Sequence, residues 1–115
     1  MKSDKKSLVS EKKEVLILDL TNENKPINES FLRIFGYFLR SVLGKIFGLN
    51  NIDFKIRGEK SKVESFVKAV SREASYMKAV EKHGLKNPTT YKNKSKLNSA
   101  IKSFEKETGI KWPFY

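Results

Sequence analysis

Lysine is the residue type in this sequence whose number and spacing best support a chemical role. The stretch between Glu81 and Glu105 contains six lysines and no acidic residue. An ammonium group is a compact point charge, and together with the backbone amides at a helix start it can hold phosphate oxygens. We therefore expect phosphate contacts from this stretch and from the outer face of the helix before it. The candidate nucleic-acid-binding residues are Lys68, Arg72, Lys78, Lys82, Lys86, Lys92, Lys94, Lys96 and Lys102.

Two pairs among these residues carry like charges four positions apart, namely Lys68 with Arg72 and Lys78 with Lys82. Such pairs repel each other on a helix surface, and a bound anion would relieve the repulsion. Tyr91 lies in the lysine-rich stretch and suits either stacking on a base or covering the core. Lysine does not read bases in the bidentate way of arginine, of which the chain has four. We therefore expect contacts to the nucleic-acid backbone with little sequence preference.

The whole chain is strongly basic, since 24 lysines and arginines against 13 aspartates and glutamates give its 115 residues a formal charge of +11. This charge favours an anionic partner, which could be nucleic acid, an acidic protein surface or an anionic membrane. Solvated charge on a lysine- and asparagine-rich chain explains the same composition. Net charge alone therefore does not define a binding surface.

Residues suited to catalysis are few. The sequence has no cysteine, which excludes thiolate nucleophiles and disulfides. Its single histidine, His83, is expected at a helix end, where its simplest role is an interaction with the helix dipole. Asp19, Asp53 and Glu59 are the acids nearest to predicted strand ends, and a carboxylate metal site built from them is the alternative, which requires the three to converge. We expect a protein that is not an enzyme and has no catalytic residue, metal, cofactor or small-molecule substrate.

A long amphipathic helix over residues 61–83 is the clearest structural prediction. Residues 52–57 before it alternate apolar and charged side chains, as a half-buried strand does, and Gly58 ends that strand. Ser61 and Glu64 then have the spacing of a capping box, in which each side chain satisfies a free amide at the helix start. The predicted apolar stripe of the helix comprises Val63, Phe66, Val67, Val70, Ala74, Met77 and Val80.

The chain after this helix is expected to turn twice. Gly84 is predicted as a left-handed helix cap, with Leu85 folding back onto the last turn. Residues 87–90 are predicted as a turn, because proline cannot continue a helix. A last helix over residues 94–108 follows and ends at Gly109. Its inner face is predicted to consist of Leu97, Ala100, Ile101 and Phe104.

The remaining elements complete a small α+β domain. Residues 15–20 form a short apolar run, typical of a strand covered on both faces. A helix over residues 29–47 connects this strand to the strand at 52–57, so the two strands are expected to pair in parallel. Trp112 and Phe114 are expected to fold back and close the core. The predicted fold is therefore α+β and mostly helical, with two short strands and three helices.

The segment from Phe31 to Phe47 is apolar around more than half of its helical circumference. Three interpretations remain open for it: a buried central helix, an interface with another copy or a larger partner, and attachment to an anionic membrane surface. The central helix is the default, because so small a domain has little other core. The interface interpretation would use Phe35, Phe38, Val42 and Phe47.

Residues 1–14 mix charges and serines without periodicity and are expected to form a flexible leader before a single domain at 15–115. The leader has no apolar signal segment, and Arg33 and Arg40 interrupt the one long apolar run. We therefore expect a cytoplasmic or otherwise intracellular protein. Its expected function is non-enzymatic nucleic-acid binding. The alternative is a structural or assembly protein, such as a small component of a phage or other particle.

Overall fold

The computed structural model describes residues 14–21 and 28–114. The predicted leader therefore lies, apart from Glu14, outside the described residues. The described chain forms, in order, β1 (Val15–Asp19), α2 (Glu29–Ile46), β2 (Asp53–Arg57), α3 (Lys60–His83) and α4 (Pro88–Thr108). This confirms the predicted small α+β fold with two short strands and three helices.

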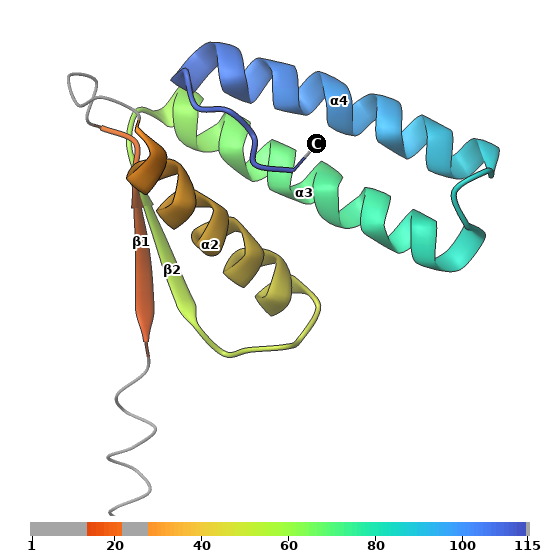
Figure 1. Ribbon diagram of the computed structural model, residues 1–115, viewed down its shortest axis with the longest axis horizontal. Coiled ribbons are helices and arrows are strands. Elements are labelled where there is room, and N and C mark those ends of the chain that lie inside the picture. The colour runs from red at the N-terminus through yellow and green to blue at the C-terminus, as the bar shows by residue number, and fades with distance from the viewer. Residues whose placement is uncertain (1–13, 22–27, 115) are drawn as a thin grey trace, which may run out of the picture.

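The two strands pair in parallel, as predicted, with Val15 opposite Asp53 and Asp19 opposite Arg57. Parallel neighbours need a crossover connection, and α2 supplies it. In Figure 1 this helix runs beside the two strands, while α3 and α4 form a separate helical pair.

Only one face of this thin sheet is covered. Leu18 and Leu20 belong to the core, whereas Val15 and Ile17, which point the other way, are 45% and 49% exposed. The prediction that the first strand is covered on both faces is therefore wrong. The reason is that α2 packs on one side, and no other described helix covers the opposite side (Figure 1).

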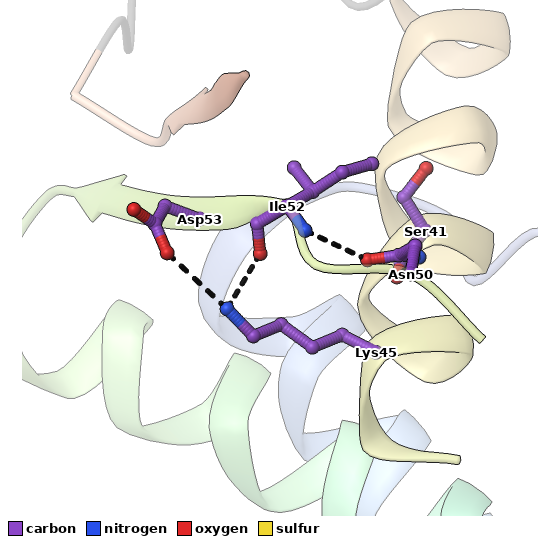
Figure 2. Close-up of polar contacts among 5 residues, drawn as sticks. All are labelled: Ser41, Lys45, Asn50, Ile52 and Asp53. Carbon is purple, nitrogen blue, oxygen red and sulfur yellow. Dashed lines mark hydrogen bonds and ion pairs between the residues drawn. The ribbon is translucent and has the colours of Figure 1, made fainter. Parts of the chain in front are cut away.

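The connection from α2 to β2 is held by side chains at both of its ends (Figure 2). Asn50 donates from Nδ2 to the carbonyl of Ser41 at 3.0 Å, and its Oδ1 accepts from the amide of Ile52 at 3.0 Å. Lys45 donates from Nζ to the carbonyl of Ile52 at 2.6 Å and lies 3.3 Å from Oδ1 of Asp53. These bonds fix where β2 starts relative to the end of α2.

Helix α2 carries the centre of the core. Phe35 is fully buried, and its ring lies among four other aromatic rings of the core region. The ring-centroid distances from Phe35 are 6.3 Å to Phe31, 5.9 Å to Phe66, 5.7 Å to Phe104 and 6.2 Å to Trp112. Aromatic contacts thus join α2 to α3, α4 and the C-terminal tail. None of the helices in the described residues has the length and apolar character needed to cross a membrane.

Helix α3 does not start with the predicted capping box. It begins at Lys60, and Glu59 occupies the N-cap position without a capping hydrogen bond from its side chain. Ser61 therefore lies inside the first turn. Glu64 lies one turn after Lys60, and their charged side-chain atoms are 4.0 Å apart, which is an ion pair along the helix surface and not the predicted capping bond to a backbone amide.

The buried side of α3 also differs from the predicted stripe. Phe66, Val70 and Ala74 are buried as expected, but Val67 and Met77 are 49% and 40% exposed. In addition, Ala69, Glu73 and Ala79 are buried although they were not part of the predicted stripe. The helix is packed on more than one side, because α4 lies along it, so a single stripe does not describe its buried surface.

Two predictions for the end of α3 and the start of α4 are wrong. Gly84 has φ 81° and ψ 172°, which is positive but not left-handed helical, and Leu85 is 63% exposed. The predicted turn at 87–90 is instead the start of α4, with Pro88 in its first turn. Asn87 caps this helix by accepting from the amide of Thr89 at 2.8 Å. Proline fits there because the first turn of a helix leaves its amides unbonded within the helix.

The C-terminal part follows the predictions. Gly109 ends α4 in the left-handed conformation, with φ 74° and ψ 5°. Of the predicted inner face of α4, Leu97, Ala100 and Phe104 are buried and Ile101 is half-buried. Trp112 is 3% exposed and Phe114 packs against the core, so the aromatic tail does close it.

Candidate nucleic-acid interface

The candidate lysines lie on a hairpin of two antiparallel helices, α3 and α4, which run side by side (Figure 1). Thr90, which is 1% exposed, joins them at the closed end of the hairpin. Its Oγ1 lies 2.7 Å from the carbonyl oxygen of Gly84 and 3.3 Å from that of Ala79, and it donates to these acceptors. The two helices therefore have a fixed mutual orientation, which decides which lysines share a surface.

Trp112 defines one face of this hairpin. Its indole N–H donates to Oε1 of Glu73 on α3, and its backbone N–H donates to Oε2 of Glu105 on α4, both at 2.9 Å. The tail therefore lies against both helices on the side that Glu73 and Glu105 share. Because successive helical residues are rotated by about 100°, the positions opposite these two glutamates can be identified on each helix.

Five lysines lie on the opposite face. On α3, Lys82 is rotated about 180° from Glu73 around the helix axis, and Lys68 and Lys78 are rotated about 140° from it. On α4, Lys96 is about 180° from Glu105, and Lys92 is about 140° from it. All five residues are exposed, and Lys78 lies at the edge next to α2, with its Nζ 5.7 Å from the ring centroid of Phe47. We call this surface the basic face, and it consists of Lys68, Lys78, Lys82, Lys92 and Lys96.

The acids on this side of the hairpin lie at one end. Glu64 on α3 and Glu107 on α4 also point away from Trp112, by the same rotation per residue. Because the helices are antiparallel, the start of α3 lies beside the end of α4, which places both glutamates at the open end of the hairpin. At the closed end, Lys78, Lys82, Lys92 and Lys96 therefore form the most positive part of the basic face.

The remaining four predicted residues are not on the basic face. Arg72 is half-buried near the seam between the helices, and Lys86 is exposed in the connection between them. Lys94 is turned toward the Trp112 side, where its Nζ lies 4.8 Å from the ring centroid of Tyr76. Lys102 is exposed but only about 60° from Glu105. The structure thus brings together five of the nine predicted residues.

Of the two roles predicted for Tyr91, covering the core is wrong, and stacking on a base stays a prediction. It is 60% exposed, so it does not cover the core. It is also only about 40° from Glu105 along α4, which places it on the Trp112 side of the hairpin. A base stacked on Tyr91 would therefore be turned away from the basic face.

No protein-family model matches this chain, and the searches of curated proteins and of solved structures return no significant match.

The apolar residues of the alternative interface lie mainly in the core. Phe35 and Phe38 are 0% and 3% exposed, and Val42 and Phe47 are half-buried against the core. The outward side of α2 instead presents Ile34 and Tyr37, which are 64% and 53% exposed. Ile46, at the end of the same helix, is 44% exposed. An interface on the outward side of α2 would therefore involve other residues than the four predicted ones.

The acids considered for a metal site are spread over the sheet. Asp19 ends β1 and Asp53 begins β2, so in a parallel pair they lie at opposite ends. Asp19 accepts from the amide and the hydroxyl of Thr21, and Asp53 is bonded to Lys45. Across residues 14–21 and 28–114, no three histidine, cysteine or acidic side chains are grouped to hold a metal ion.

Proposed function

We propose that this protein binds nucleic acid by contacting its phosphates with the basic face. The observation that carries the proposal is the convergence of five exposed lysines from two helices on one surface, with the acids of that surface at its far end. Phosphate contacts supply most of the affinity of sequence-independent binding. A surface of this composition therefore suits binding with little base preference.

The geometry of the hairpin supports contacts to several phosphates at once. Lys78 with Lys82, and Lys92 with Lys96, are each four residues apart, which places their Cβ atoms about 5–6 Å from each other. Packed helices are about 8–10 Å apart, so the two pairs form parallel rows on one surface. The first turn of α4 is at the same end, and its amides add positive potential. Lys82 and His83 lie in the last turn of α3, where they offset its negative end.

The proposal is tested by reversing charges on one helix in two places. Lys92→Glu with Lys96→Glu changes the basic face, whereas Lys102→Glu with Lys106→Glu changes exposed residues of the same helix outside it. Both double variants lower the net charge equally and keep the four-residue spacing. We expect the first to weaken binding to a mixed-sequence duplex about tenfold more than the second, by fluorescence anisotropy at fixed salt. Equal weakening by both would mean that net charge, and not this face, attracts the ligand.

A second function, assembly with other copies or with a larger partner, is favoured by one observation. Ile34 and Tyr37, three residues apart on α2, are both more than half exposed. If they form an interface, size-exclusion chromatography with light scattering will show oligomers at high concentration, and Ile34→Ser with Tyr37→Ser will restore the monomer. A monodisperse wild-type monomer would count against self-assembly.

A further inference from the structure

We infer that the ligand of the basic face is double-stranded rather than single-stranded nucleic acid, an inference that rests on the proposed function. The side chains that accompany the five lysines on the surface distinguish between these two ligands. Helices α3 and α4, which carry the five lysines, are described along their whole length, and Phe47, at the end of α2, lies beside Lys78.

The neighbours of the lysines are small hydroxyl residues. Ser71 and Ser75 on α3, and Ser99 and Ser103 on α4, are all exposed and lie between about 120° and 160° from Glu73 or Glu105. Thr89 at the start of α4 points the same way. These hydroxyls can donate hydrogen bonds to phosphate oxygens, as serine and threonine commonly do at nucleic-acid backbones.

Aromatic residues are missing from this side of the two fully described helices. Tyr76 is half-buried beneath Lys94, and Tyr91 lies on the Trp112 side. Phe66 and Phe104 are in the core. Proteins that bind single strands without sequence preference stack bases on aromatic rings, which contributes about 1–3 kcal/mol per base. The ring nearest to the basic face from outside these helices is that of Phe47, which is half-buried and has Nζ of Lys78 5.7 Å from its centroid. Neither helix therefore presents an open ring for stacking on this side.

A surface that binds by charge alone favours the ligand with the higher charge density. A duplex carries one phosphate per about 1.7 Å of its axis. Each phosphate that a lysine neutralises releases about 0.9 counterions from a duplex and about 0.7 from a single strand. The lysines also form two rows about 8–10 Å apart. Two rows can contact the two backbones that border a groove, whereas a single strand presents one backbone.

The experiment compares a 20-base-pair mixed-sequence duplex DNA, the matching duplex RNA, and a 20-nucleotide oligothymidylate, each titrated with the full chain at two salt concentrations. We expect both duplexes to bind about tenfold or more tightly than the single strand, with a steeper dependence on salt. Tyr91→Ala should leave the affinity for the single strand unchanged, because that ring lies off the basic face.

Two other results would overturn the inference in distinguishable ways. Salt-sensitive binding in which the single strand equals or exceeds both duplexes would remove the duplex preference but leave the proposed function. Absence of salt-sensitive binding to all three ligands would remove the proposed function itself, and the inference with it.

Discussion

Trp112 fixes the position of the hairpin relative to the rest of the molecule. Its two N–H groups donate to carboxylates on different helices, and its ring lies 5.4 Å from that of Phe104 and 6.2 Å from that of Phe35. Glu73, one of its acceptors, is 1% exposed. A carboxylate so deeply buried is tolerated only where hydrogen-bond donors reach it, and Trp112 is one of them.

Replacing Trp112 by phenylalanine should therefore destabilise the fold. The change removes the indole N–H that Glu73 accepts and leaves a cavity beside Phe104, so we expect a loss of about 2–3 kcal/mol in the free energy of unfolding. Urea unfolding followed by circular dichroism measures it. Lys111→Ala, at the exposed preceding position, is the control and should change stability by less than about 0.5 kcal/mol. A loss below that limit for Trp112→Phe would contradict the structural role given to the tail.

The burial of Glu73 could not be predicted from its residue type and its position in the helix. An acid within an amphipathic helix is normally assigned to the solvent side, since an unpaired buried charge is costly. The single tryptophan is the residue that indicates a buried acceptor, because a buried indole N–H requires one. The sequence indicates that such an acceptor exists, but its identity depends on contacts 39 residues apart.

Helix α4 begins with Asn87 and Pro88, two residues that favour the start of a helix. Asn87 has extended backbone angles and accepts from the amide of Thr89, while Pro88 follows in the first turn. An N-cap of this kind contributes about 1 kcal/mol to stability. It also determines where the lysine rows begin, because Lys92 lies just over one turn after Pro88.

We expect Asn87→Ala to lower the free energy of unfolding by about 1 kcal/mol, since the amide of Thr89 loses its acceptor. Asn98→Ala, at an exposed position in the middle of the same helix, is the matched control and should be neutral or slightly stabilising, because alanine has the higher helix propensity. Chemical unfolding of both variants gives the comparison. Equal effects would show that the cap does not stabilise α4.

The elements themselves could be predicted from apolar spacing, whereas some of their ends could not. Both strands, their parallel pairing and all three helices follow from the pattern of the sequence. The start of α4 was misplaced because Pro88 was interpreted as a helix breaker, although proline is also a common first residue of a helix. The stripe on α3 was only partly right, because α4 packs on a side that the larger apolar residues do not mark.

Along the α3–α4 hairpin, positive charge is distributed unevenly. The closed end of the α3–α4 hairpin carries lysines from both helices, and the acids on the same side, Glu64 and Glu107, lie at the open end. The sequence identified the lysine-rich region. It could not show that Lys92 and Lys96 share a face with Lys78 and Lys82, because this depends on the rotation of α4 against α3, which Thr90 and Trp112 fix through long-range bonds.

The salt dependence of binding to duplex DNA tests most directly whether the basic face contacts phosphates. If the five lysines of the basic face each neutralise one phosphate, the logarithm of the binding constant falls with the logarithm of salt concentration with a slope of about −4 to −5. Replacing Lys78, Lys82, Lys92 and Lys96 together by glutamine should make this slope shallower by about 3–4. A slope that the quadruple variant leaves unchanged would contradict the claim that this surface binds nucleic acid.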